Sequence, residues 1–325
     1  MGSTRTAYAA PLGACAIYLI ALAGSTSAQA VLPPKGEGTV AVSYQSVLAQ
    51  GHLGPDGNKP STPAGRDRFR SHVLMSDVEF GLTDRISVGF SLPFIATRYD
   101  GDVPHLLGVH GQPSTTDDGT YHGLFQDFRF GGRFNVRARP LVITPFVEAI
   151  LPSHHYESRG HAVAGQDMRA LVLGTSLARS LDSIIPRTYF QAQLSHAFVQ
   201  KVAGIRANRS RVDVEVGHAV TPRLALTFSE NLKLTHDGVD FPYAGLTTEL
   251  SRNHDRLSRN NTLNLGGGFT FALSESLDVF GVVSKLVWGQ NVHAHWGYGV
   301  ALNWHFQIGP ALWEPRKQVR RTAVP

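Results

Sequence analysis

The stretch that decides the fold is Trp296-Gly297-Tyr298-Gly299-Val300-Ala301-Leu302-Asn303-Trp304-His305-Phe306. Its even-numbered residues are large and apolar, and its odd-numbered residues are small or polar. Successive side chains of a β-strand point to opposite faces, so this segment has one apolar face and one polar face. Ten residues of about 3.3 Å each, tilted by about 40°, span roughly 25 Å, the height of the apolar band on an outer-membrane barrel. The stretch therefore predicts one strand of a transmembrane β-barrel.

The same unit, an alternating stretch followed by a turn, recurs along the chain. It predicts twelve strands, near residues 38–50, 70–82, 85–98, 122–136, 140–152, 167–179, 187–200, 208–219, 223–235, 260–273, 276–288 and 294–308. Short turns alternate with longer loops, which cover about residues 51–69, 99–121, 153–166, 201–207, 236–259 and 289–293. Short periplasmic turns, long outer loops and an even strand number are typical of bacterial barrels. We therefore predict an all-β fold, a transmembrane antiparallel up-and-down barrel of about twelve strands.

The N-terminus predicts export. Residues 8–24 are apolar, Arg5 precedes them, and Ala28-Gln29-Ala30 is a small-residue cleavage site, as in a secretory signal peptide. The alternative is a lipoprotein box at Cys15, but the apolar run continues beyond this cysteine, which is the only one in the chain. The expected organisation is a signal peptide at 1–30, an outer-membrane barrel at 31–308 and a basic, disordered periplasmic tail at 309–325. The expected location is the outer membrane of a Gram-negative-type bacterium.

Composition excludes several classes of protein. The net charge is +5 and the mean hydropathy is −0.10, and no run of eighteen apolar residues follows the signal peptide, which excludes a helical membrane protein. The basic residues are scattered, so we expect no nucleic-acid partner. Nucleotide motifs, metal-ligand spacings and redox pairs are missing from the sequence, so we expect no cofactor and diffusive transport.

Two residues break the expected pattern of an apolar outer face. Glu230 falls on the lipid-facing row, and Pro93 removes a backbone donor from a closed sheet. A β-bulge near either residue would accommodate it. Aromatic residues, which are enriched at membrane interfaces, are expected at the edges of the apolar band. The candidates for these interface positions are Trp288, Trp296, Tyr298, Trp304 and Phe306.

Two passages resemble one family of outer-membrane proteins. Phe80 to Phe94 reads FGLTDRISVGFSLPF, with a Gly-Leu-Thr-Asp-Arg turn, an alternating strand and a Leu-Pro-aromatic end, and Gly123 to Phe134 is similar to the next strand of that family. The family is that of outer-membrane channels named after the meta-cleavage pathway of phenol degradation, grouped loosely with the long-chain fatty acid transporter barrels. The resemblance implies passage of hydrophobic or aromatic small molecules. Only Val31 to Glu37 lie between the signal peptide and the first strand, so an N-terminal hatch like that of fatty acid transporters is not expected.

Alternation also assigns charged residues to the lumen. The expected lumen-lining residues are Asp77, Glu79, Asp127, Arg129, Arg133, Arg211, Asp213, Glu215, Lys233 and Lys285. Charged groups in a pore set its ion selectivity, whereas in a narrow barrel they can pair with one another and fill the interior. Both readings stay open. The segment His105 to Val109 is a candidate for a constriction that folds inward, with an exposed mobile loop as the alternative.

The sequence contains residues of the types used in two kinds of chemical site, a metal site and a hydrolase site. His154-His155 and His293-Ala294-His295 bring imidazoles near one another, but neither shows a recognised metal-ligand spacing, so no metal is expected. A hydrolase needs a nucleophilic serine and a histidine base with an orienting group, and residues 253–258 contain His254, Asp255 and Ser258. Such strings are common in polar loops, so we expect no enzymatic activity and no catalytic residue.

These observations favour a porin-like outer-membrane channel for passive uptake or efflux of small molecules, including hydrophobic or aromatic ones. A non-conducting structural or loop-displaying barrel is the alternative, and an outer-membrane lipid hydrolase is the third. The expected partners are outer-membrane lipids and lipopolysaccharide, a small-molecule solute and the barrel-assembly machinery.

Overall fold

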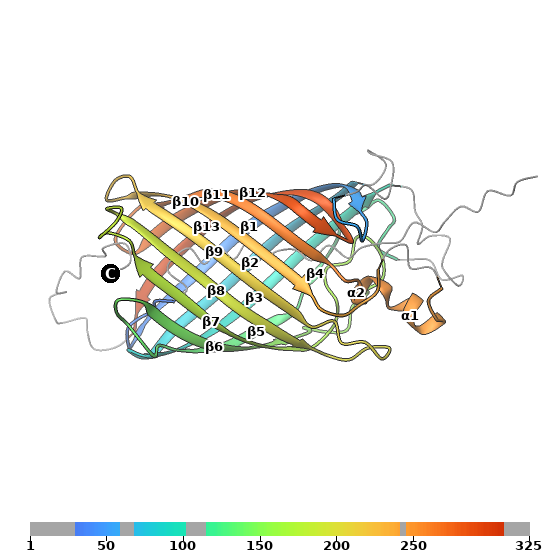
Figure 1. The fold of residues 1–325 in the computed structure, drawn as a ribbon, viewed down its shortest axis with the longest axis horizontal. Helices are drawn as coiled ribbons and strands as arrows, with labels where there is room; N and C mark the ends of the chain where they lie inside the picture. The colour runs from blue at the N-terminus through green and yellow to red at the C-terminus, as the bar shows by residue number, and fades with distance from the viewer. Residues whose placement is uncertain (1–29, 59–67, 102–114, 241–244, 309–325) are drawn as a thin grey trace, which may run out of the picture.

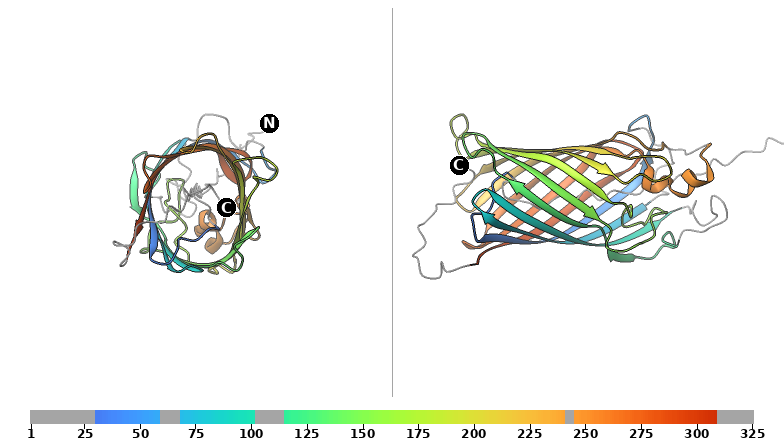
Figure 2. Two further views of the ribbon diagram at one scale, coloured as in Figure 1. Left: turned by 90° about the vertical axis from the view of Figure 1, so that its left-hand side faces the viewer. Right: turned by 90° about the horizontal axis from the view of Figure 1, so that it is seen from below.

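The computed structural model describes residues 30–58, 68–101, 115–240 and 245–308, which form one closed antiparallel sheet (Figure 1). Its strands are β1 (Glu37–Leu53), β2 (Arg68–Thr83), β3 (Ile86–Asp100), β4 (His122–Phe125), β5 (Phe128–Phe134), β6 (Val142–Leu151), β7 (Ala170–Ser180), β8 (Thr188–Val199), β9 (Arg209–Ala219), β10 (Leu224–Thr235), β11 (Asn261–Ala272), β12 (Leu277–Gln290) and β13 (Val292–Gln307). Neighbours in sequence pair with each other, except that β4 and β5 both pair with β3, and β1 pairs with β13, so the sheet closes (Figure 2). The predicted all-β barrel is confirmed.

One position in the wall is shared by two short strands. Both β4 and β5 pair with β3, so the thirteen strands fill twelve positions around the barrel. Leu92 and Pro93 of β3 lie opposite three residues, 126–128, which contain one extra residue and thus a β-bulge. Proline has no N–H to donate across the sheet, although its carbonyl still accepts the N–H of Gln126 at 2.9 Å. The structure therefore has the bulge expected near Pro93.

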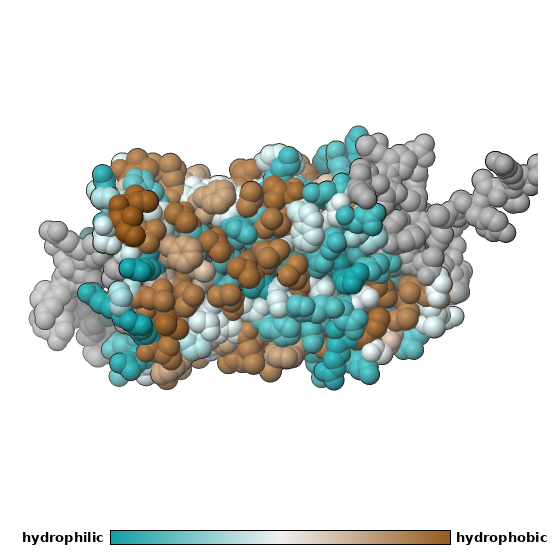
Figure 3. Space-filling view, in the orientation of Figure 1, coloured by the Kyte–Doolittle hydropathy of each residue, from teal (hydrophilic) through white to brown (hydrophobic). Residues whose placement is uncertain are grey.

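The two faces of the wall follow the predicted alternation. On β13 the outward residues Trp296, Tyr298, Val300, Leu302 and Trp304 are each 43–53 % exposed, and apolar atoms spread over the strand region in Figure 3. An exposed apolar surface of this kind suits lipid and not water. Glu230 lies in the outward row of β10, and the register on both sides of it is uninterrupted, so the bulge considered there is absent.

Short turns and long loops occupy opposite ends of the barrel, with one exception. The predicted long loop at 289–293 is wrong, because β12 and β13 are joined by Asn291 alone. Asn291 has a φ of 51°, a left-handed conformation that asparagine tolerates. The loop after β10 contains two short helices, α1 (Thr248–Arg252) and α2 (His254–Leu257). Within the described residues, neither helix is long and apolar enough to cross a membrane.

The short-turn end of the lumen contains residues 30–36. Gly36 donates its N–H to the Gly81 carbonyl of β2 at 2.9 Å and accepts the N–H of Ile308, just after β13, at 2.7 Å. Ala30 is buried against Val142 of β6 and Ala178 of β7, which lie five and six places from β13 in the ring of twelve. The segment therefore runs across the opening of the barrel. It is a short strap and not a hatch domain, and no pattern in the sequence indicated its path.

Candidate functional site

Charged and polar side chains line the inside of the barrel. On β10 the side chain of Lys233 points inward and is 4 % exposed. On β9 the odd-numbered residues point inward, and the even-numbered residues, such as the exposed Val216, point outward. All but one of the charged residues assigned to the lumen lie on the inner side of the wall or at its inner rim: Asp77, Glu79, Asp127, Arg129, Arg133, Arg211, Asp213, Glu215 and Lys233. Their part in selectivity stays a prediction.

Lys285 is the exception, and its assignment to the lumen is wrong. It alternates on β12 with the buried Ser284 and Leu286, and its ammonium lies 5.0 Å from the centroid of the Trp296 ring on the outer face. The physical reason is the run 279–283, which is apolar on both faces because its inward residues form an apolar patch of the lumen. Alternation therefore did not distinguish the faces of this strand.

The lumen charges have mixed environments. Arg133 Nη1 lies 3.9 Å from Glu79 Oε1, a long ion pair between neighbouring parts of the wall. Glu215 instead accepts hydrogen bonds from two neutral groups, the Tyr189 hydroxyl at 2.7 Å and the Gln191 amide at 2.8 Å. Strand β9 lies opposite β2 in the ring, so these groups face each other across the interior. The lumen charges therefore form neither a complete ion-pair network nor a row of unpaired charges along an open pore.

The connection between β6 and β7, residues 152–169, folds into the barrel. We call these residues the plug. Its middle is a run of small apolar residues, Ala162-Val163-Ala164, each at most 4 % exposed. Ala164 packs against Val73, Met75 and Ile95, an apolar patch on the inner face of β2 and β3. The segment predicted as a long outer loop at 153–166 therefore occupies the lumen. The constriction considered at 105–109 lies outside the described residues.

One buried carboxylate binds the tip of the plug. Asp117, in the segment before β4, is 2 % exposed and accepts the backbone N–H groups of His161 at 2.8 Å and Ala162 at 2.9 Å. Its other oxygen lies 3.0 Å from His161 Nδ1. The His161 ring stacks on Tyr99 at 4.0 Å between centroids, and the Thr97 hydroxyl donates to the Ala162 carbonyl. A buried carboxylate is stable only with such donors, so Asp117 favours the plugged state.

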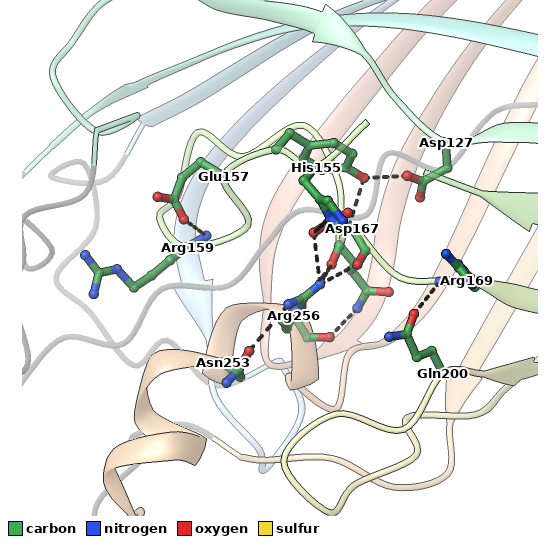
Figure 4. A network of polar contacts seen from close by, with 11 residues as sticks. Asp127, His155, Glu157, Arg159, Asp167, Arg169, Gln200, Asn253 and Arg256 are labelled. Carbon is green, nitrogen blue, oxygen red and sulfur yellow. Dashed lines mark hydrogen bonds and ion pairs between the residues drawn. The ribbon is translucent and has the colours of Figure 1, made fainter. Parts of the chain in front are cut away.

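A second set of contacts joins the plug to α2 and the wall (Figure 4). Arg256 donates from Nη2 to the Gln166 carbonyl at 2.7 Å and also to the Asp167 carbonyl. The Gln166 side chain returns a hydrogen bond to the Arg256 carbonyl at 2.6 Å and accepts one from Arg209 of β9. Loop backbone inside a barrel needs partners for its polar groups, and here side chains supply them.

Asp127 connects the plug to the bulge in the wall. Its carboxylate accepts the Tyr156 hydroxyl at 2.5 Å, and the Tyr156 oxygen accepts the N–H of Asp167 at 2.9 Å. Burial, and after it the nearby Asp127 carboxylate, raises the pKa of Tyr156, so the phenol keeps its proton and donates it. Asp127, predicted to line the lumen, therefore holds the plug to the wall through Tyr156.

Helix α2 contributes a charged pair. Asp255 accepts the N–H of Gly160 in the plug at 2.9 Å and lies 3.0 Å from His254 Nε2. His254 Nδ1 lies 2.5 Å from the Ser251 carbonyl, so both ring nitrogens face acceptors. Burial, the largest single influence, lowers the pKa of His254, but the Asp255 carboxylate and the Ser251 carbonyl together outweigh it, and the net pKa is raised above its usual 6.5. The geometry is that of an imidazolium.

This pair predicts a pH dependence. Because the pKa of His254 is raised in the folded state, its contribution to stability is complete below pH 6.5 and is lost as the pH rises through the folded pKa. We therefore expect the plug to lose protection from hydrogen exchange as the pH rises above 6.5, measured on peptides from residues 152–169 after correction for intrinsic exchange. His254→Gln should remove this dependence. An unchanged dependence in the variant would assign it to another group.

The serine and histidine considered for hydrolysis are engaged elsewhere in this structure. The Ser258 hydroxyl donates to Asn260 Oδ1 at 2.8 Å, and a hydroxyl has only one proton to donate. His254 presents its nitrogens to Ser251 and Asp255, which leaves no lone pair to accept a proton from serine.

Several histidines meet at the long-loop end of the lumen. The ring centroids of His52 and His161 lie 5.2 and 5.9 Å from that of His293, and His293 Nδ1 has no hydrogen-bond partner among the described residues. His155 is exposed and pairs with Asp167 at 3.2 Å. In the described part of the chain, no three histidine, cysteine or acidic residues are arranged to bind a metal ion.

Asp117 and Arg256 contact the plug and His161 lies in it, although no pattern in the sequence predicted a role for them. One signal was available: the apolar run Ala162-Val163-Ala164 inside a polar loop is unusual for a segment exposed to water. The partners of this run could not be found, because they lie in other loops and strands.

Comparisons with known proteins support the fold. Neither a family model nor a curated protein matches the sequence. An outer-membrane channel from Pseudomonas putida F1 is similar in structure, with a TM-score of 0.66, 12 % identity, and coverage of 86 % of this chain and 98 % of that one. The translocator domain of the autotransporter NalP from Neisseria meningitidis has a TM-score of 0.46, 8 % identity, and coverage of 84 % and 90 %. A deletion mutant of TodX, a monoaromatic hydrocarbon channel, has a TM-score of 0.44 and 9 % identity, and the match covers 84 % of this chain and 91 % of that one.

This chain is an outer-membrane β-barrel. Its closed wall and exposed apolar band, and the first of these similarities, agree on that fold. At 12 % identity the likeness is one of fold alone.

Proposed function

We propose that this protein is an outer-membrane channel for passive uptake or efflux of small molecules, and that the plug gates it. The observation that carries the proposal is a lumen lined by charged and polar residues behind a plug bound by side chains. Asp117, Asp255 and Arg256 bind the plug through hydrogen bonds, each of which a rearrangement can break and remake. The protein of similar structure from Pseudomonas putida F1 is described as a channel.

The solutes proposed are small hydrophobic or aromatic molecules that carry a polar group. The lumen has an apolar patch at Val73, Met75 and Ile95 on β2 and β3, and β9 on the opposite side carries charged residues. Such a lining contacts both parts of an amphipathic solute. The same class of solute is implied by the likeness of Phe80 to Phe94 to the phenol-degradation channel family, and membership of that family is part of the proposal.

The test is single-channel recording of refolded protein in a planar bilayer, with and without benzoate as the aromatic probe. We expect rare, stable conductance steps from wild-type protein, and benzoate should shorten or reduce them because it occupies the lumen. Acetate, which carries the same charge without the ring, is the matched control. Silence from folded protein, with the plug intact and with it released, would contradict the channel.

A structural barrel is the second candidate. The hydrogen bonds of Glu215 to neutral neighbours and the buried plug favour it, because both are consistent with a filled interior. No enzymatic activity is proposed. The partners proposed are outer-membrane lipids and lipopolysaccharide around the apolar band, the transported solute, and the barrel-assembly machinery during insertion.

A further inference from the structure

A row of outward side chains crosses the barrel wall near its long-loop end. The strand register pairs Lys285 with Trp296, Trp296 with Leu48, Leu48 with Arg70, and Arg70 with Arg98. Directly paired residues of antiparallel strands lie about 5 Å apart at their Cα atoms and point to the same side of the sheet. The two arginines are therefore neighbours on the outer face of β2 and β3.

The arginines form a concentration of positive charge. Like charges directly opposite each other destabilise a sheet, so this pair needs an anion. Asp100 supplies one carboxylate, 2.6 Å from Arg98 Nη2, and it is the cross-strand partner of the exposed Arg68. Arg70 is exposed, and within the described ranges it makes no hydrogen bond or ion pair. One guanidinium fork of the pair is thus available to a ligand.

An aromatic group lies beside the arginines on the same face. His72 bridges two exposed tyrosines, with its Nδ1 2.7 Å from the Tyr44 hydroxyl and its Nε2 3.1 Å from the Tyr121 hydroxyl. The Arg98 guanidinium lies 5.9 Å from the centroid of the Tyr121 ring. Tyrosine is amphipathic and is enriched where a membrane meets water, so this group marks the headgroup level.

The charge lies at the edge of the apolar band. On β2 the outward residues Leu82, Val78 and Leu74 are apolar and exposed, and the same row continues as His72 and Arg70. Below the arginines a bound molecule therefore meets apolar wall, and beside them it meets hydroxyl and imidazole groups. A free anion would use only the guanidinium groups, whereas a lipid with an anionic headgroup would use all of these surfaces.

We propose that Arg70 and Arg98, with Tyr44, His72 and Tyr121, bind a phosphate group of a phosphorylated glycolipid in the outer leaflet. The guanidinium fork of Arg70 matches the oxygens of a phosphate, which accept bidentate hydrogen bonds, and Arg98, whose Nε and Nη2 bind Asp100, adds positive charge beside it. The tyrosine and histidine groups contact the sugar, and the acyl chains lie on the apolar rows of β1 and β2. The site lies outside the lumen and is independent of conductance.

The experiment measures binding of full-length refolded protein in detergent to fluorescent, phosphorylated rough-type lipopolysaccharide. We expect Arg70→Gln/Arg98→Gln to weaken binding by roughly tenfold or more, because a hydrogen bond to a charged group contributes about that factor. Arg223→Gln, the same change at an exposed arginine in a short turn at the opposite end, is the matched control and should bind as wild type does. The gel mobility of unheated samples checks that each barrel is folded.

Two further ligands identify the source of the phosphate. Lipopolysaccharide freed of its phosphates should bind weakly, and inorganic phosphate should not compete at concentrations that leave the barrel folded. Equal binding by the double variant, or by the dephosphorylated glycolipid, would overturn the proposal. Full competition by inorganic phosphate would overturn it in favour of a simple anion site. Arg70→Lys, which keeps the charge and loses the fork, should give an intermediate affinity.

Discussion

Asp117→Ala is expected to convert a closed barrel into one that conducts steadily. The substitution leaves the backbone N–H groups of His161 and Ala162, and one nitrogen of the His161 ring, without their buried acceptor. Removing one partner of a buried, hydrogen-bonded charge costs about 3–5 kcal/mol. If that cost falls on the plugged state alone, the ratio of open to closed barrels rises by roughly a hundredfold to a thousandfold or more. Planar bilayer recordings should show this as a change from rare to continuous conductance.

The neighbouring residue provides a matched control. Asp118 is also acidic but exposed, and hydrogen bonds from His122 and Thr120 lower its pKa to about 2. None of these contacts involves the plug, so Asp118→Ala should conduct as wild type does. Equal conductance from wild type and Asp117→Ala would show that the plug does not limit passage. A folded, silent Asp117→Ala barrel would favour the structural alternative.

The second large effect is expected on ion selectivity. Arg129 and Arg133 lie on the inner face of β5, where Arg133 is 3.9 Å from Glu79. A unit charge about 5 Å from a permeating ion changes its energy by about 0.8 kcal/mol in water, a roughly fourfold change in permeability ratio. In the Asp117→Ala background, Arg129→Ala or Arg133→Ala should therefore shift selectivity toward cations by about this factor, measured as a reversal potential in a salt gradient.

The controls for selectivity use the two faces of the wall. Lys285→Gln removes a positive charge from the outer face and should leave the reversal potential unchanged, because its ammonium contacts the Trp296 ring and not the lumen. Glu79→Gln should shift selectivity in the opposite direction to the arginine variants. If the arginine variants only lower the melting temperature, the charges form a structural network.

The wall of the barrel could be predicted from the sequence because its signal is local. The alternation from Trp296 to Phe306 depends only on consecutive residues, and each such stretch reveals one strand and its faces. Pro93 marked the bulge for a similarly local reason, the missing N–H. Prediction failed where the local signal weakened: Lys285 follows a run that is apolar on both faces, because β12 contributes an apolar patch to the lumen.

The interior could not be predicted in the same way. The plug depends on contacts between distant segments: His161 with Asp117, 44 residues away, and Gln166 with Arg256, 90 residues away. Residues 253–258 contain the residue types of a hydrolase site, but in the structure Asp255 and Arg256 form hydrogen bonds to the plug. The sequence of a loop shows which polar groups need hydrogen-bond partners when the loop is buried, but it does not show where in the fold those partners lie.

The sequence by itself determined a membrane barrel of twelve wall positions, its apolar outer band and the inward rows of charge, since a two-residue period is a property of neighbouring residues. Only the tertiary structure decided that the loop after β6 folds into the lumen, that residues 30–36 enter its other end, and that Arg70 and Arg98 meet on the outer face. The reason is physical: these features depend on strand register and on loop contacts, which form only when segments far apart in the chain close into one ring.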